Sequence, residues 1–340
     1  MSNLIQNLHI QNFKSVRDLS LDCDRINIFI GKPNAGKSNI LEAISLLGAG
    51  YSEGRFMEGF IRYKTVVQLF SNFNFHVPIE IVADEIVAKV TSSSKQGGAF
   101  NLSIQPTNLD LWQRRKNRKF NVPFTGGLFN FPLNGTLDRD WSHSVSSVKK
   151  YDFQTLGDYQ EKGLFLHPPY GDNFYLIVRS NADLREEIQQ FLQPNGLELL
   201  LDEESQRIVV VKKDNGSLLS FPLHLVPDTF QRYIFHLAAI MSNRDSVLLF
   251  EEPESHSYAP YIYQLAQHIL DDEGGNQYFI TTHNPYFLLP IMQEGKDVAV
   301  FATWFKDYQT HARRLSETEI REVLDYGVDV FLNFDHFIPE

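Results

Sequence analysis

Residues 31 to 38 read Gly31-Lys32-Pro33-Asn34-Ala35-Gly36-Lys37-Ser38, which matches the phosphate-binding pattern GxxxxGK[ST] at every fixed position. The preceding run, residues 26–30, is β-branched and aromatic and predicts a buried strand. After Ser38 the apolar residues recur at helical spacing as far as Gly48, so a helix should follow the loop. A strand, a loop of small residues and a helix, in this order, form the context that a phosphate loop requires.

The chemistry of phosphate binding accounts for each residue type in this loop. Small and turn-permissive residues let successive backbone N–H groups point inward at an anion, and the positive end of the following helix adds to the attraction. Lys37 is the expected cation for the β- and γ-phosphates, and the Ser38 hydroxyl is an expected Mg²⁺ ligand. The alternative is a turn whose lysine is merely solvated, and the flanking elements argue against it.

A second polar group follows another predicted strand. Residues 247–250 are fully apolar and run directly into Glu251-Glu252-Pro253-Glu254. At the carboxyl end of a parallel strand, these carboxylates would face the same edge of the sheet as the phosphate loop. Glu251 is therefore the expected Mg²⁺ ligand, and Glu252 is the expected general base that polarises the attacking water. A solvated acidic turn is the alternative.

A third strand-end group is His283, in the run Thr281-Thr282-His283-Asn284-Pro285, which follows a strand expected over residues 278–281. A neutral imidazole there could hydrogen-bond the γ-phosphate or the attacking water. A histidine in this position is more often a structural hydrogen-bonding residue when it stands alone. Its place after the paired glutamates favours function, so Lys37, Glu252 and His283 are the predicted catalytic residues.

The composition describes an ordinary globular protein. The chain has 340 residues, 43% hydrophobic and 21% charged, which allows roughly two lobes at about 150 residues per domain. A net charge of -11 argues against general binding to nucleic-acid backbones. The single cysteine, Cys23, excludes a disulfide framework and cysteine-rich zinc sites. Because the sequence shows neither a secretory leader nor a run of about 18 apolar residues, we expect a cytoplasmic protein without a membrane span.

Strands and helices alternate in the last part of the chain, which predicts an α/β sheet buried on both faces. Further strands are expected over residues 77–90, 100–104 and 208–211, and helices over 183–192, 230–241 and 258–270. Residues 105–170 are rich in Asn, Gly, Pro and aromatic residues and predict an inserted lobe. We therefore expect three parts: residues 1–100 with the phosphate loop, 101–220 as the inserted lobe, and 221–340 with both strand-end groups.

Four stretches together resemble an ABC-type ATPase of the RecF/SMC/OLD-like group, above all the stand-alone bacterial ATPases that often sit beside an effector gene. They are the opening run Leu8-His9-Ile10-Gln11-Asn12-Phe13-Lys14-Ser15, the phosphate loop, residues 250–256 and residues 281–285. The resemblance implies a P-loop NTPase with an ABC ATPase head, in which a RecA-like lobe and an antiparallel β lobe surround one nucleotide. It is specific over residues 1–50 and about 220–290.

The resemblance also implies roles for individual residues. Lys14 and Ser15 match positions near the nucleotide phosphates, and with Asn39 and the phosphate loop they form the expected ATP-binding set. Glu251, Glu252 and His283 match the Walker B acid, the catalytic glutamate and the switch histidine. The group usually has Asp where Glu251 stands, and the longer carboxylate can still reach a Mg²⁺ ion.

Two motifs of the group are incomplete here. The signature motif, Ser-x-Gly near the start of a helix, binds ATP of the opposite subunit in a dimer. Its expected place holds Val226-Pro227-Asp228-Thr229-Phe230-Gln231-Arg232, with neither Ser nor Gly. Proline removes a backbone donor and the threonine Cβ resists close approach, which puts contact with the partner's ATP in question. For the Q-loop, Gln154 and Gln160 are both candidates.

The leading hypothesis is a Mg²⁺-dependent ATPase that forms a homodimer or higher homo-oligomer on ATP. By the resemblance it would control a separately encoded effector, a nuclease or toxin, in bacterial anti-phage defence. With about 50 residues after Pro285 and no matching acidic cluster, we expect no toprim nuclease activity in this chain, and the sequence shows no long heptad coiled coil.

Two alternatives stay open: a nucleotide-gated scaffold with little turnover, and a RecF-like DNA-repair ATPase. The second would bind nucleic acid through Arg114-Arg115-Lys116-Asn117-Arg118-Lys119, which otherwise is a solvated basic loop or a contact for an acidic partner. Residues 329–340, with three phenylalanines at a spacing of three, predict a docked terminal element.

Overall fold

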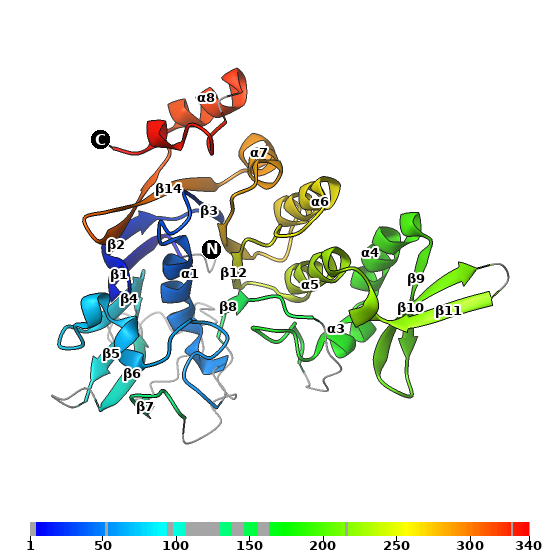
Figure 1. Ribbon diagram of the computed structural model, residues 1–340, viewed down its shortest axis with the longest axis horizontal. Helices are drawn as coiled ribbons and strands as arrows, with labels where there is room; N and C mark the ends of the chain where they lie inside the picture. Colours follow the sequence, from blue (N-terminus) through cyan, green and yellow to red (C-terminus); the bar gives the residue numbers. More distant parts are fainter. Residues whose placement is uncertain are drawn as a thin grey trace. The chain divides into compact units, whose positions relative to one another are not determined.

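The chain forms two compact units in a computed structural model that describes residues 5–51, 54–93, 98–106, 129–137, 146–155, 163–214, 217–327 and 329–339 (Figure 1). The first unit contains residues 1–150, 245–252 and 275–340, and the second contains residues 151–244 and 253–274. The predicted parts with boundaries near residues 100 and 220 stay a prediction. Over the described ranges, no helix has the length and apolar character needed to cross a membrane.

A mixed sheet of six strands organises the first unit, in the order β15-β14-β3-β13-β12-β8. Its strands are β3 (Ile26–Ile30), β8 (Val148–Tyr151), β12 (Val247–Glu251), β13 (Gln277–Thr281), β14 (Val298–Lys306) and β15 (Gln309–Arg314). Neighbours β14, β3, β13 and β12 are parallel, and β15 is antiparallel to β14. Every residue of β3 and β13 is buried, as central strands covered on both faces require. The strands predicted at 26–30, 246–250 and 278–281 are confirmed.

The register of the central strands aligns their carboxyl ends. Phe29 of β3 is opposite Thr281 of β13, and Thr281 is opposite Glu251 of β12. The phosphate loop follows β3 directly, Glu252 follows β12, and His283 comes two residues after β13. Because carboxyl ends of parallel strands meet at one edge of a sheet, the three predicted groups converge there.

An antiparallel sheet forms the other layer of the first unit, in the order β2-β1-β4-β5-β6-β7. Its strands are β1 (Asn7–Phe13), β2 (Val16–Asp22), β4 (Ile79–Ala83), β5 (Ile86–Ser92), β6 (Ala99–Pro106) and β7 (Phe129–Pro132). Helix α1 (Lys37–Ser45) packs on β12 and β13 of the mixed sheet and also on β1 (Figure 1). The RecA-like sheet and the antiparallel β lobe that the resemblance implied are therefore both present.

The C-terminal part of the first unit contains helix α7 (Pro285–Glu294), helix α8 (Glu317–Tyr326) and a 3-10 helix, Phe334–Phe337. Asn284 caps α7 by accepting a hydrogen bond from the Tyr286 N–H, with proline in the first turn. Phe334 and Phe337 are buried, so the prediction of a docked terminal element is confirmed.

The second unit combines helices with a small antiparallel sheet. Its elements are α3 (Phe174–Ser180), α4 (Ala182–Leu192), α5 (Asp228–Ser242), α6 (Ala259–Leu270), and the sheet of β9 (Leu197–Asp202), β10 (Arg207–Asp214) and β11 (Ser217–Pro222). Phe191 of α4 stacks on Tyr233 of α5 with ring centroids 4.1 Å apart and meets Tyr261 of α6 edge-on. The helices predicted at 183–192, 230–241 and 258–270 are confirmed.

Candidate functional site

The phosphate loop has the backbone geometry of an anion-binding nest. Asn34 and Gly36 both lie in the left-handed region, with φ of 62° and 95°. Gly36 cannot be replaced without strain, because a Cβ there would lie 1.9 Å from the Thr310 Oγ1 atom of β15. A Cβ at Gly31 would lie 2.1 Å from the Thr303 carbonyl oxygen. Both fixed glycines of the motif are thus required by close backbone approach.

Lys37, the first residue of α1, is buried beneath this loop. Its Nζ atom donates to the carbonyl oxygens of Gly31 at 3.0 Å and Lys32 at 3.1 Å. Burial lowers the pKa of the Lys37 ammonium to about 8, and the charges of Glu252 and Glu251 offset this only in part. The neighbouring loop residue, Ser38, contacts Glu251 directly, so the loop and the end of β12 meet at one place.

Glu251 is the last residue of β12, and its carboxylate faces three hydrogen-bond donors. The Ser38 hydroxyl donates to Glu251 Oε1 at 2.5 Å, and the Arg62 guanidinium lies 3.1 Å from the same oxygen. Lys150 Nζ lies 3.5 Å from the other oxygen, Oε2. Burial alone would raise the pKa of the Glu251 carboxyl, but these facing donors hold it below its usual value. Glu251 is therefore an ionised carboxylate.

Glu252 and His283 form the second pair at this edge. The two side chains are partly exposed, and His283 Nε2 lies 3.5 Å from Glu252 Oε1. The Glu252 N–H donates to the Thr281 carbonyl at 3.0 Å, and Glu252 has a φ of 45°, a strained value for a residue with a Cβ. Burial and the Lys37 charge lower the pKa of His283, against the opposing effect of Glu252, so its imidazole is neutral near pH 7.

Lys14 and Ser15 lie between β1 and β2, and each contacts a different residue of α1. Lys14 Nζ forms an ion pair with Glu42, a fully buried residue of α1 that also pairs with Arg62 Nε at 3.0 Å. Ser15 Oγ accepts a hydrogen bond from Asn39 Nδ2 at 2.6 Å. Lys14 is thus held by a carboxylate, whereas Ser15 is tied to the first turn of α1.

The C-terminal element reaches the phosphate loop. Both carboxylate oxygens of Asp335 lie within hydrogen-bond distance of Lys32 Nζ, at 2.6 and 2.8 Å. A pocket of about 430 Å³ lies here, with Pro33, Trp304 and Ile338 among its lining residues. The loop residue Lys32 therefore already has a carboxylate partner on its own chain.

Other predicted residues lie elsewhere. The signature positions belong to the second unit, where Asp228 opens α5 and pairs with Arg232 at 2.7 Å. Gln154 is exposed in the same unit. Gln160 and the basic run 114–119 lie outside the described residues.

Three residues at the site were missed by sequence reasoning: Glu42, Arg62 and Lys150. A charged Glu42 among the apolar positions of α1 was a usable signal, because a glutamate is rarely buried without a cation. Arg62 and Lys150 carried no such signal in the local sequence, because each is separated from its partner Glu251 by about 100 residues or more.

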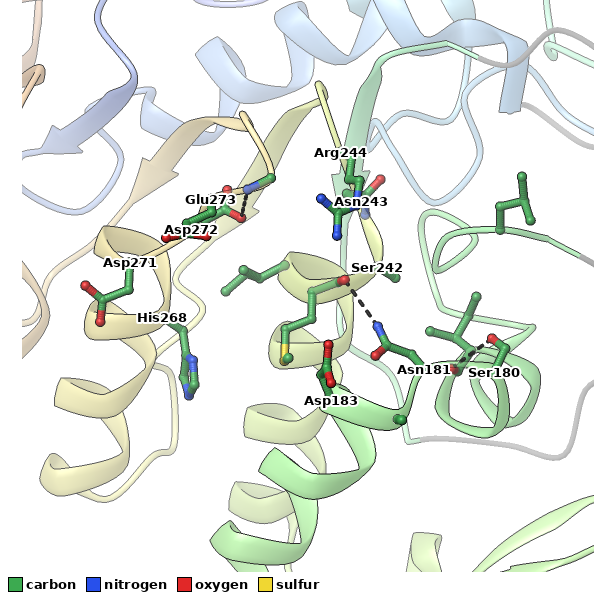
Figure 2. Close-up of a pocket in the computed structure, with 16 residues that line it drawn as sticks. Ser180, Asn181, Asp183, Ser242, Asn243, Arg244, His268, Asp271, Asp272 and Glu273 are labelled. Carbon is green, nitrogen blue, oxygen red and sulfur yellow. Dashed lines mark hydrogen bonds between the residues drawn. The ribbon is translucent and has the colours of Figure 1, made fainter.

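The second unit has a pocket of its own, of about 850 Å³ (Figure 2). Its charged lining residues are Asp183, Arg244, His268, Asp271, Asp272 and Glu273. Four carboxylates against one guanidinium give these walls a negative field, which repels polyphosphates. None of the predicted site residues line this pocket, and the candidate nucleotide site lies in the first unit.

The fold and the loop geometry define the class: the protein is a P-loop ATPase whose fold is that of an ABC/SMC-like ATPase head. Residues 26–289 match the family described as "AAA domain, putative AbiEii toxin, Type IV TA system", and the chain belongs to this family.

Individual relatives agree with this assignment. The chain is 20% identical over 330 residues to an ATP/GTP phosphatase of Helicobacter pylori (strain ATCC 700392 / 26695), with 84% of this chain and 86% of the relative covered. A segment of 44 residues, 13% of this chain and 20% of the relative, is 50% identical to an uncharacterized protein of Methanocaldococcus jannaschii. Among solved structures, an Smc head bound to the C-terminal winged-helix domain of ScpA is similar in fold, with a TM-score of 0.52 and 12% identity over 93% of this chain and 99% of that chain.

Proposed function

We propose that the protein hydrolyses ATP with Mg²⁺ at the edge of the mixed sheet, and that it dimerises on ATP to control a separately encoded effector. One observation carries the proposal: Lys37, Ser38, Glu251, Glu252 and His283 converge there from α1, β12 and the turn after β13. Cation, hydroxyl, paired carboxylates and imidazole are the groups that phosphoryl transfer to water needs.

Binding of the polyphosphate is assigned to the loop. The backbone N–H groups of the loop, which Pro33 lacks, and the start of α1 would supply partial positive charge. Lys37 supplies a full charge, and its ammonium would exchange the Gly31 and Lys32 carbonyls for phosphate oxygens. The partners that it leaves are neutral, so this exchange is favourable for a trianionic or tetra-anionic ligand.

The oxygen atoms of Ser38 and Glu251 are suitable ligands for Mg²⁺. Ser38 Oγ and Glu251 Oε1 are hard oxygen atoms 2.5 Å apart, and Mg²⁺ is commonly held by one or two carboxylates with substrate phosphates. No three His, Cys, Asp or Glu side chains gather as a metal cluster in the described part of the chain. When bound, the ion would neutralise charge that develops on the phosphates.

The attacking water is assigned to Glu252 and His283. Glu252 Oε1 would accept a proton from the water, and the neutral His283 would orient the water or the γ-phosphate by a hydrogen bond. The strained backbone at Glu252 is anchored to Thr281, and its carboxylate faces His283 Nε2 at 3.5 Å.

Dimerisation and effector control are the finer part of the proposal. They are supported by the family description, which names a toxin, and by the Smc head, which is bound to another protein in its crystal structure. By analogy, ATP binding would close two heads and hydrolysis would reopen them. A nuclease or toxin in anti-phage defence is the proposed effector.

A nucleotide-gated scaffold is the second candidate, and one observation favours it. The Thr229 hydroxyl, at the signature position, donates to the His256 carbonyl at 2.8 Å. The Thr229 hydroxyl would have to leave this carbonyl to donate to a γ-phosphate of a partner head. Phosphate release from Mg·ATP decides between the two: steady turnover supports the enzyme, and tight binding with no release supports the scaffold.

The lowered pKa of Lys37 predicts that ATP binding weakens at alkaline pH. The ammonium must be protonated to attract phosphate, so the dissociation constant should rise as pH passes about 8. We expect binding about tenfold weaker at pH 9 than at pH 7. Fluorescence anisotropy with a labelled ATP measures this. A flat profile for the wild type, or the same slope in Lys37→Arg, would contradict the assignment.

Removal of the Asp335 carboxylate should tighten ATP binding. The side chains of Lys32 and Asp335 are 60% and 73% exposed, so their ion pair holds Lys32 only weakly. We expect Asp335→Asn to bind ATP about two- to fivefold more tightly, because Lys32 is released toward the phosphates. Glu322→Gln, which breaks the His336–Glu322 contact of the same element, is the matched control and should leave the affinity unchanged.

A further inference from the structure

Strand β8 carries two buried lysines in succession, and their ammonium groups have different partners. Lys149 Nζ donates to Ser246 Oγ at 2.9 Å, just before β12 begins. Lys150 Nζ donates to the Phe60 carbonyl at 2.9 Å and lies 3.5 Å from Glu251 Oε2, where β12 ends. One of these two buried lysines, Lys150, therefore lies at the candidate phosphate site.

The burial of Lys150 makes its charge effective. A buried ammonium is costly unless a carboxylate compensates it, and the Lys150 side chain is only 3% exposed. Arg62 also contacts Glu251, but its side chain is 69% exposed, so water and salt screen its charge. Lys150 is therefore the stronger counter-charge for Glu251.

The neutralisation of Glu251 affects whether a polyphosphate can bind before a divalent cation does. Glu251 contacts Ser38 of the phosphate loop and Glu252 follows it in the chain, so two uncompensated carboxylates there would repel a polyphosphate. A divalent cation can remove this repulsion, but only once it is bound. An ammonium fixed by the fold removes it at all times.

We propose that Lys150 is a resident counter-cation that positions and neutralises Glu251, so that a nucleoside triphosphate binds the phosphate loop even without a divalent metal ion. Lys150 acts through Glu251 and is a positioning residue. The inference rests on the proposed function and adds to it a prediction about metal-free binding.

The test compares the affinity of a fluorescent ATP derivative in EDTA with its affinity in Mg²⁺. Lys150→Met and Lys150→Gln should weaken metal-free binding about tenfold, whereas binding with saturating Mg²⁺ should stay within about twofold, because the ion then supplies the missing charge. Lys150→Arg keeps the charge and should restore metal-free binding. Lys149→Met is the matched control, one residue away and equally buried, and should behave as the wild type in both conditions.

Two results would overturn the inference. The first is the same ratio of the two affinities in the wild type and Lys150→Met, whether binding is unchanged or equally weakened in both conditions. The second is absence of nucleotide binding by the wild type in either condition, which would overturn the proposed function as well. Lys150→Gln retains a donor for the Phe60 carbonyl, and a thermal unfolding curve checks that each variant is folded.

Discussion

Glu252→Gln is expected to bind Mg·ATP about as tightly as the wild type and to release phosphate at least about a hundredfold more slowly. The amide keeps the shape of the side chain and the backbone anchor to Thr281, but it cannot accept a proton from water. Its contact with His283, at 3.5 Å in the wild type, can persist as a neutral one. Coupled phosphate-release and nucleotide-binding assays measure both quantities.

The same variant tests the dimer. With hydrolysis blocked, heads that close on ATP should accumulate, and light scattering should show a rise in mass that needs ATP. Glu58→Gln, at an exposed glutamate of the same unit, is the control and should hydrolyse ATP normally. Wild-type turnover in Glu252→Gln would remove Glu252 from the role of general base.

Lys37→Met is expected to weaken ATP binding on the order of a hundredfold or more, because it deletes the buried charge that faces the phosphates. The stability of the unliganded protein should be unchanged or higher. Burial already disfavours the Lys37 ammonium, as its lowered pKa indicates, and its hydrogen-bond partners are neutral carbonyls. A methionine fills the same space without this desolvation cost.

Equilibrium dialysis with ATP and a thermal unfolding curve separate the two effects of Lys37→Met. Lys64→Met, at an exposed lysine, should change neither. A variant that unfolds at much lower temperature would show that Lys37 is a structural residue. Undiminished ATP binding would show that the loop does not hold the phosphates.

Local patterns account for what the sequence could predict. The β3 strand, the loop and α1 are consecutive, so apolar periodicity and the spacing of small residues are sufficient to place Lys37 and Ser38. Glu251 and His283 could be placed because Glu251 ends an apolar strand and His283 comes two residues after another. The rule that parallel strands end at one edge then brought these groups together.

Long-range pairing accounts for what was missed. Glu42, Arg62 and Lys150 acquire their environment from partners on other elements, and no local pattern encodes that pairing. In the second unit, Leu199, Leu200 and Leu201 of β9 are consecutive leucines, without the β-branched residues of the run 208–211 that predicted β10. Strand β14 carries a usable β-branched and aromatic run, residues 298–305, that sequence reasoning passed over.

A crystal structure with Mg²⁺ and a non-hydrolysable ATP analogue tests the central claim most directly. We predict that Lys37 Nζ leaves the carbonyls of Gly31 and Lys32 and binds phosphate oxygens, with the metal ion joined to Ser38 Oγ. The γ-phosphate should face Glu252 and His283. Phosphates bound away from residues 31–38, or a Lys37 that keeps both carbonyl partners with the analogue present, would contradict the account.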